Sequence, residues 1–336
     1  MSSKRLGAIG IHGLEIGYPA TGNDAGFLRS KISFSALQGE LIALIGPNGI
    51  GKSTLLRTMA GFLKQRQGDI NYQGRSLRGY KPHELARLIS FVSTDQMSIS
   101  NMRVSELVAY GRFPYTGWLG RLTRDDLDKV REAIGDVGLT RHTNRMVSQL
   151  SDGERQRALI ARAITQDTPF ILLDEPTAFL DVENKYEIFH LLHRLAREQQ
   201  KTIVLSTHDL NIALREMDKV WMMLENDSLE GAPEDAVLQG WLDRLFPKGN
   251  IAFDAATGAY YVKKVHAGTA SVQGDGPAYY WTIRALERRG YYFTTQSGAD
   301  LHILLKTNEN GILVWQVDHN GNAFEVASVY DLFNAI

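Results

Sequence analysis

The sequence predicts an α/β protein in which helices cover both faces of a mostly parallel sheet, followed by a small α+β domain. Short apolar runs alternate with helical patterns as far as Pro247. Such alternation indicates parallel strand pairing with both faces of the sheet buried. Beyond Pro247 the sequence is richer in Tyr, Gly and short alternating strands. We therefore expect two domains, residues 1–247 and 248–336.

The apolar runs place the expected elements along the chain. The expected strands of the first domain are Ile9–Tyr18, Phe27–Leu37, Glu40–Ile45, Leu88–Val92, Phe170–Leu173, Thr202–Ser206 and Val220–Leu224. The expected helices include Ser53–Phe62, Asp125–Val137, Glu154–Thr165 and Asn184–Gln199. In the second domain AYYVKKV, TASV, YYFTT, LHILL and ILVWQV alternate like strands, and Ala278–Arg289 and Ser328–Ala335 are typical of helices.

Composition limits the possible functions. The net charge of −1 argues against a broad attraction to nucleic acid or to an anionic bilayer. The absence of cysteine excludes disulfides and thiolate metal sites. No run of about 18 apolar residues is present, and the N-terminus has no continuous apolar segment typical of a signal peptide. We expect a cytoplasmic protein that meets a membrane only through a partner.

A glycine-rich loop between an apolar strand and a helix predicts a phosphate site. Residues 46–54, GPNGIGKST, match the pattern G-x-x-x-x-G-K-[ST]. The expected nucleotide-binding residues are Gly46, Pro47, Asn48, Gly49, Ile50, Gly51, Lys52, Ser53 and Thr54. Backbone N–H groups and the helix N-terminus attract phosphate, Lys52 reaches the β- and γ-phosphates, and the Ser53 hydroxyl is a ligand for Mg²⁺.

Two acids and a histidine follow other apolar strands. Asp174 and Glu175 end the strand Phe170–Leu173, and His208 follows Thr202–Ser206. Asp174 is suited to hold Mg²⁺ and Glu175 to polarise the attacking water as general base. In a parallel sheet His208 lies at the same edge, where it could contact the γ-phosphate. The alternatives are acids that cap the next helix and a purely structural histidine.

The order of these motifs resembles the ATP-binding cassette (ABC) family. The resemblance covers about residues 9 to 230 and is carried by the phosphate loop, LSDGERQR at 150–157, ILLDEPTAFLD at 171–181 and STHD at 206–209. The implied fold adds an antiparallel β subdomain and a helical subdomain to the parallel sheet. The implied activity is hydrolysis of ATP with Mg²⁺ by a dimer of cassettes.

The resemblance implies further site residues. Tyr18 would stack on adenine, although a core aromatic is the alternative. Gln96 would contact Mg²⁺ or the water and couple the site to a transmembrane partner. Ser151 and Gly153 would reach the γ-phosphate of the other cassette, and Asp181 would contact that cassette.

The signature departs from the family pattern LSGGQ, because here it is LSDGE. Asp152 and Glu154 place negative charge where a triphosphate should dock. Repulsion there would weaken closure on the nucleotide unless Arg155 and Arg157 offset it. We still expect activity, since Ser151 and the other site motifs are intact.

The segment from Gln96 to Leu122 resembles cassettes of type II importers, which carry iron–siderophores, haem or cobalamin. Its aromatic and apolar side chains could receive a permease helix or could be core; they are Phe113, Tyr115, Trp118 and Leu119. The implied partners are a second cassette, a permease and, indirectly, a substrate-binding protein, at the inner face of the plasma membrane. The alternatives are an ABC exporter ATPase, a soluble ABC ATPase acting on nucleic acid or the ribosome, and a non-hydrolysing regulatory module.

The second domain resembles no family that we can name from its sequence. Residues 272–278, VQGDGPA, predict a strand, a glycine turn and a helix, and a plain turn is favoured over an anion site. The clusters Tyr260-Tyr261, Tyr279-Tyr280-Trp281 and Tyr291-Tyr292-Phe293 are expected in a core or an interface. A regulatory or dimer-stabilising role is the hypothesis for this domain.

Overall fold

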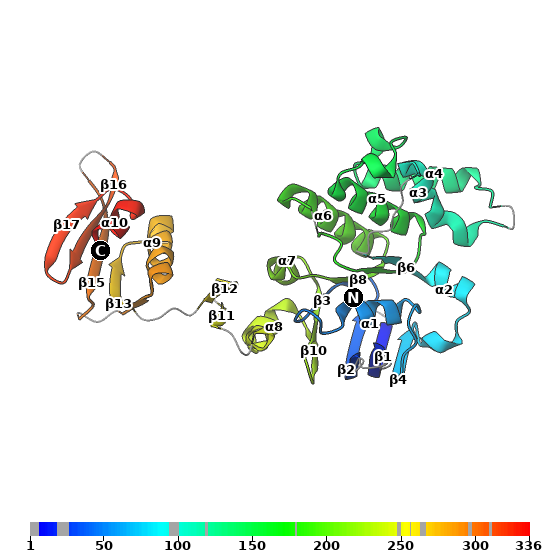
Figure 1. Cartoon of the computed structure of the whole chain (residues 1–336), viewed down its shortest axis with the longest axis horizontal. Helices are drawn as coiled ribbons and strands as arrows, with labels where there is room; N and C mark the ends of the chain where they lie inside the picture. The colour runs from blue at the N-terminus through cyan, green and yellow to red at the C-terminus, as the bar shows by residue number, and fades with distance from the viewer. Residues whose placement is uncertain are drawn as a thin grey trace, which may run out of the picture. The chain divides into compact units, whose positions relative to one another are not determined.

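The computed structural model describes residues 7–18, 27–93, 101–117, 120–178, 180–246, 250–255, 257–262, 267–294, 298–308 and 311–336. The chain forms two compact units, one of Met1–Pro247 with Phe253–Ala259 and one of Lys248–Ala252 with Tyr260–Ile336 (Figure 1). The predicted α/β class with a smaller α+β part is confirmed. The division of function between residues 1–247 and 248–336 stays a prediction.

The first unit contains a six-stranded sheet in the order β10-β9-β3-β8-β7-β6. Its strands are β3 (Leu41–Ile45), β6 (Ile89–Val92), β7 (Phe170–Leu173), β8 (Thr202–Ser206), β9 (Lys219–Met223) and β10 (Ser228–Gly231). Neighbouring strands are parallel except at the edge, where β10 is antiparallel to β9. Every residue of β3, β7 and β8 is buried, as in a sheet covered on both faces. The carboxyl ends of these three strands therefore meet at one edge.

Helices flank this sheet. They are α1 (Lys52–Met59), α6 (Val182–Glu198), α7 (Leu210–Arg215) and α8 (Pro233–Leu238), with the short η5 (Trp241–Leu245). Helix α6 buries an apolar stripe that includes Ile188, Leu192 and Leu195. This spacing is that of an amphipathic helix packed on a sheet.

A second, antiparallel sheet has the order β2-β1-β4-β5. Its strands are β1 (Gly7–Tyr18), β2 (Phe27–Leu37), β4 (Gln67–Tyr72) and β5 (Arg75–Ser76), followed by η1 (Leu77–Gly79) and α2 (Pro82–Leu88). Phe34 of β2 stacks on Trp221 of β9 with ring centroids 4.9 Å apart. Both rings are almost fully buried, so this pair joins the two sheets.

A helical layer completes the first unit and lies away from the antiparallel strands in Figure 1. It contains α3 (Val104–Ala109), η2 (Tyr110–Tyr115), α4 (Arg124–Asp136), η3 (Thr140–His142), η4 (Val147–Gln149) and α5 (Asp152–Thr165). Helices α3 and α4 both contact α5.

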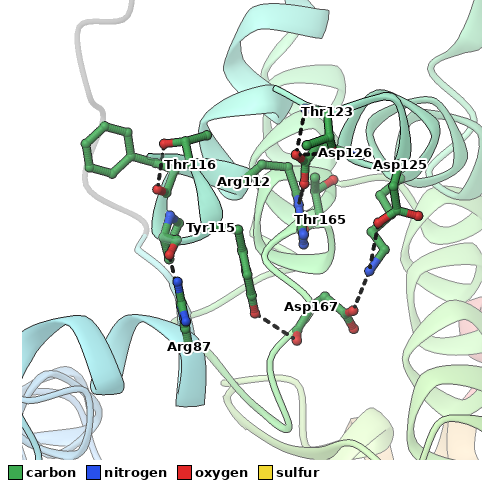
Figure 2. A network of polar contacts seen from close by, with 12 residues as sticks. Arg87, Arg112, Tyr115, Thr116, Thr123, Asp125, Asp126, Thr165 and Asp167 are labelled. Carbon is green, nitrogen blue, oxygen red and sulfur yellow. Dashed lines mark hydrogen bonds and ion pairs between the residues drawn. The ribbon is translucent and has the colours of Figure 1, made fainter. Parts of the chain in front are cut away.

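A buried ion pair fixes η2 within this layer (Figure 2). The Arg112 Nε donates to Asp126 Oδ1 at 2.8 Å, and Arg112 Nη1 donates to the Thr165 carbonyl at 2.9 Å. Hydrogen bonds from Thr123, with further help from Arg112, lower the pKa of Asp126 to about 2. A buried ion pair stabilises the fold only when its remaining lone pairs also accept hydrogen bonds, as they do here.

The aromatic side chains of η2 point to different environments. The guanidinium groups of Arg112 and Arg87 lie 4.0 and 5.2 Å from the centroid of the Tyr115 ring, and Tyr115 is only partly exposed. Phe113 is 69% exposed. Of the side chains expected to receive a partner helix, Phe113 is therefore available and Tyr115 is held inside the layer. Trp118 and Leu119 lie outside the described residues.

The second unit is a five-stranded sheet in the order β14-β13-β15-β16-β17 with two helices. Its elements are β13 (Gly268–Gln273), α9 (Gly276–Arg289), β14 (Tyr291–Phe293), β15 (Leu301–Thr307), β16 (Leu313–His319), β17 (Asn322–Val326) and α10 (Val329–Ala335). A separate two-stranded sheet pairs β11 (Ile251–Asp254) with β12 (Ala259–Val262). The core of the five-stranded sheet includes Leu286, Ile303 and Trp315.

The aromatic clusters of this unit are only partly in its core, against which Tyr291 packs. Tyr280, Trp281 and Tyr292 are 42%, 65% and 51% exposed. Core packing is therefore confirmed for Tyr291 and not for these three exposed side chains, for which an interface role stays a prediction. The expected strand, glycine turn and helix at residues 272–278 are present as β13 and α9.

Within the described ranges, no helix has both the length and the apolar character that a membrane crossing needs.

Candidate functional site

The glycine-rich loop joins β3 to α1 at the carboxyl edge of the sheet. Gly46 has φ of +154°, and a Cβ at this position would lie 2.5 Å from the Met223 carbonyl oxygen of β9. Gly51 is the N-cap of α1 with φ of +108°, in the left-handed region that favours glycine. These two glycines allow the backbone to turn tightly from strand to helix, so the loop amides lie at the N-terminus of α1.

Lys52 is held by the loop that precedes it. Its Nζ donates to the carbonyls of Gly46 at 2.8 Å and Pro47 at 3.1 Å, and the residue is 6% exposed. Burial lowers the pKa of Lys52, and the charges of Glu175 and Asp174 act against that shift. An ammonium group has three donors, so one N–H remains for a phosphate oxygen.

Ser53 and Asp174 meet, as the sequence predicts, although they are far apart along the chain. The Ser53 hydroxyl donates to Asp174 Oδ1 at 3.0 Å, and the Ser206 hydroxyl donates to the same oxygen at 2.7 Å. Asp174 is 2% exposed, so these bonds replace the water that the carboxylate loses on burial.

Glu175 and His208 also meet at this edge. His208 Nε2 lies 2.6 Å from Glu175 Oε1, and both side chains are partly exposed. The Glu175 backbone N–H donates to the Ser206 hydroxyl at 2.9 Å, and Glu175 has φ of +47°. A non-glycine residue in the left-handed region is strained, and such strain is concentrated at functional sites. The carboxylate is thus aimed at the loop side of the sheet edge by a constrained backbone and a histidine.

The signature residues form the N-terminus of α5. Ser151 is the N-cap: its hydroxyl accepts from the Glu154 N–H at 3.2 Å, and its own N–H donates to Glu154 Oε2 at 2.8 Å. This reciprocal pair is a capping box. Because Asp152 and Gly153 begin the helix, their N–H groups have no acceptor inside it and face outward with the Ser151 hydroxyl. These donors suit an anion.

The two signature acids, Asp152 and Glu154, both lie near basic side chains. Arg155 Nη1 lies 3.2 Å from Asp152 Oδ1. Arg157 does not offset the signature charge, since its Nη1 lies 3.7 Å from Glu187 Oε2 on α6. Of the two arginines that could offset the signature charge, Arg155 therefore pairs with a signature acid and Arg157 pairs with α6.

Glu154 is instead balanced by a loop that the sequence did not point to. His142 Nε2 and Arg145 Nη1 lie 3.4 and 3.8 Å from Glu154 Oε1. The hydrogen bond from the Ser151 backbone, with the charges of His142 and Arg145, lowers the pKa of Glu154. The carboxylate is therefore ionised and turned toward its own N-cap and this loop.

Some of the remaining predicted site residues lie within the described part of the chain and others do not. Asp181 is the N-cap of α6 and accepts from the Asn184 backbone and side chain at 2.8 and 2.7 Å, which lowers its pKa. Tyr18 ends β1, and its side chain lies outside what the structure describes. Gln96 lies outside the described residues altogether. Pro47, Asn48, Gly49, Ile50 and Thr54 lie in the loop and at the start of α1 as predicted.

Three contributors were missed from the sequence. Ser206 joins Asp174 to Glu175 and is fully buried. A hydroxyl at the end of an apolar strand, two residues before a histidine, was the available signal. His142 and Arg145 carried no sequence signal, because their partner Glu154 becomes their neighbour only through folding.

This arrangement is that of a phosphate-loop protein whose acids and histidine gather beside the loop at the carboxyl edge of a parallel sheet. Comparison with known proteins specifies the family. The family model described as ABC transporter matches residues 30–178. The model described as iron ABC transporter C-terminal domain matches residues 267–336. The second match corrects the expectation that this unit resembles no family; its short strands and lack of a motif hid the relationship.

Individual relatives agree with these models. A petrobactin import ATP-binding protein of Bacillus anthracis, FpuC, is 39% identical over 222 residues, which are 66% of this chain and 81% of that protein. An iron(3+)-hydroxamate import ATP-binding protein of Bacillus subtilis, FhuC, is 38% identical over 184 residues, 55% of this chain and 68% of that protein. The dimeric structure of the bacterial ABC transporter cassette MJ0796 superposes with a TM-score of 0.60 at 26% identity, covering 67% of this chain and 98% of that one. The chain belongs to the ATP-binding proteins of ABC transporters and is an ABC-type ATPase.

Proposed function

We propose that this ATPase powers the import of iron–siderophore complexes through a partner permease. The observation that carries its enzymatic part is the continuous set of contacts from Ser53 through Asp174 and Ser206 to Glu175 and His208. These side chains, gathered at one edge of the sheet, are of the types that phosphoanhydride hydrolysis needs. The cargo rests on the relatives, which are named for petrobactin and for iron(3+)-hydroxamate import.

Lys52, Ser53 and Asp174 bind the triphosphate and its metal in this proposal. A serine hydroxyl and a buried carboxylate 3.0 Å apart are hard oxygen ligands, and Mg²⁺ prefers one or two such ligands together with phosphate oxygens and water. The residues therefore fit Mg²⁺, with Gln96 as a further predicted ligand. When bound, Mg²⁺ offsets phosphate charge, while Lys52 offers its remaining N–H to the β- and γ-phosphates. Tyr18 stacks on the adenine.

Glu175 is the general base and His208 is its neighbour at the γ-phosphate. A base must lie within hydrogen-bond reach of the proton that it takes. The strained backbone at Glu175 and the bond to Ser206 keep its carboxylate directed at the site. His208, 2.6 Å from that carboxylate, can turn its ring to the γ-phosphate once a water occupies the place beside Glu175.

A second copy of the chain completes the site. Ser151 and Gly153 offer a hydroxyl and a helix N-terminus to the γ-phosphate held by the other copy, and Asp181 lies at the contact between copies. The outward N–H groups of α5 and the dimeric arrangement of the MJ0796 cassette support this proposal.

A groove at the edge of the helical layer is the proposed docking place for the permease. It has a volume of about 710 Å³ and lies among the end of α1, helix α2 and α5. Phe62, which is 66% exposed, lies at this groove and packs edge-on to Phe91 at 5.3 Å. An exposed aromatic beside an apolar groove is typical of a helix-binding surface. Together with the segment from Gln96 to Leu122, it would bring the protein to the inner face of the membrane, with the substrate-binding protein contacted only through the permease.

Uptake in cells tests the import proposal. Cells that lack this protein should lose uptake of labelled iron–siderophore, and the intact chain should restore it while Lys52→Ala should not. The intact chain should also co-purify with a polytopic membrane subunit. Normal uptake in the absence of the protein, or restored uptake by Lys52→Ala, would contradict the proposal. Uptake of haem or cobalamin in place of iron–siderophore would change the cargo and leave the importer role intact.

A further inference from the structure

The Glu154 carboxylate has two different sets of partners. Its Oε2 accepts the Ser151 N–H at 2.8 Å, while its Oε1 lies 3.4 Å from His142 Nε2 and 3.8 Å from Arg145 Nη1. The Glu154 side chain is 19% exposed. It therefore lies between the N-cap of α5 and the loop that carries the two basic residues.

The Glu154 carboxylate has two opposite electrostatic effects at the N-terminus of α5. A carboxylate at the third position of a helix closes the capping box and interacts well with the positive end of the helix. The same carboxylate repels a triphosphate that approaches the first amides of that helix. With His142 and Arg145 beside it, the carboxylate still stabilises the helix, and its repulsion of a triphosphate is reduced.

The loop that carries His142 and Arg145 is anchored. Its carbonyls accept the first amides of α3, from Val104 to Arg145 at 3.0 Å and from Ser105 to Thr143 at 3.0 Å. The Arg145 N–H also donates to the His142 carbonyl at 2.8 Å. Because both basic side chains stand on a fixed backbone, their positions relative to Glu154 are set before any ligand arrives.

We infer that His142 and Arg145 are positioning residues for ATP-driven closure of two copies of this chain. Both side chains hold the Glu154 carboxylate on the Ser151 N–H, and the Arg145 guanidinium offsets its charge, so that the triphosphate of the opposite copy meets the Ser151 hydroxyl and the first amides of α5. This inference rests on the proposed role of Ser151 in the composite site.

A double-mutant cycle on the full chain tests the inference. ATP-driven dimerisation is measured by light scattering in the Glu175→Gln background, with and without the paired change His142→Ala and Arg145→Ala. Loss of the partly exposed Arg145–Glu154 ion pair and of the His142 contact should raise the ATP concentration for half-maximal dimerisation about fivefold. When Glu154→Gln is also introduced, the paired change should have an effect below about twofold, because no charge is left to offset.

Controls separate this inference from the site that it rests on. Arg141→Ala removes one positive charge from an exposed side chain of the same loop and should leave dimerisation as it was. If the paired change weakens dimerisation equally with Glu154 intact and in the Glu154→Gln variant, the loop acts only structurally. If the paired change has no effect with Glu154 intact, the loop has no role in closure. Either result overturns the inference. Ser151→Ala in the same assay tests the composite site itself, since unchanged dimerisation there would contradict the proposed function.

Discussion

Ser206→Ala is the change from which the structure predicts the most specific loss. The hydroxyl is fully buried, donates to Asp174 Oδ1 at 2.7 Å and accepts the Glu175 N–H at 2.9 Å. A hydrogen bond to a charged group contributes about 1.5–3 kcal/mol, and a buried N–H left without an acceptor costs about 1–3 kcal/mol. We therefore expect a fall of about 2–4 kcal/mol in the free energy of unfolding, since local relaxation offsets part of that sum.

The same substitution should reduce catalysis through position. Both Asp174 and Glu175 lose the group that joins them, and small displacements of reacting groups cost up to about a hundredfold in rate. We expect kcat for ATP hydrolysis to fall about ten- to a hundredfold, with a smaller change in KM, because Lys52 and the loop are untouched.

Ser90→Ala is the matched control for Ser206→Ala. Ser90 is fully buried on β6, and its hydroxyl has no hydrogen-bond partner among the described residues. Removing it should leave stability and kcat nearly unchanged or slightly raise stability. Urea unfolding and steady-state ATPase assays of both variants decide the matter. If Ser206→Ala loses no more stability than Ser90→Ala and retains its kcat, the proposed joining role of Ser206 is refuted.

Three further predictions concern the loop and the helical layer. Gly46→Ala should weaken ATP binding, because its Cβ would meet the Met223 carbonyl at 2.5 Å, and nucleotide titration should show a loss of about tenfold or more. Arg112→Met should destabilise the fold by about 3–5 kcal/mol in urea, since it leaves Asp126 buried without its cation; a loss under about 1 kcal/mol, on the order of a surface pair, would contradict this. Asp126 has its pKa lowered to about 2 in the fold, first by Thr123, so its stabilising effect is complete above the unfolded pKa of about 4 and is lost as the pH falls toward 2. Asp126→Asn should therefore flatten the acid side of the stability curve relative to the parent chain, and parallel curves would exclude this carboxylate as the cause.

Motifs that are continuous in sequence could be predicted closely. The geometry of Gly46 to Thr54 is set by local sequence, because a strand, a glycine turn and a helix follow one another along the chain. Asp174, Glu175 and His208 were also found, since each follows an apolar run and parallel strands bring their carboxyl ends together.

Contacts that depend on register or on a distant loop could not be predicted. Ser206 reaches Asp174 only because β8 pairs with β7 in the register that sets Leu205 opposite Leu173. His142 and Arg145 meet Glu154 only because α3 fixes the loop between α4 and α5. In the second unit the alternation that identifies a strand does not predict which face is covered, so the sequence left Tyr292 as either a core or an interface residue, and the structure shows it exposed.

The proposed mechanism has Glu175 as the base for ATP hydrolysis in a site that two copies of the chain complete. Its most direct test is the oligomeric state of purified Glu175→Gln with and without ATP, measured beside its hydrolysis rate. We expect a stable dimer that forms only with ATP and a rate reduced at least about a hundredfold, since the base is lost while every binding group remains. A variant that stays monomeric with saturating ATP, or that hydrolyses ATP at the parent rate, would contradict it.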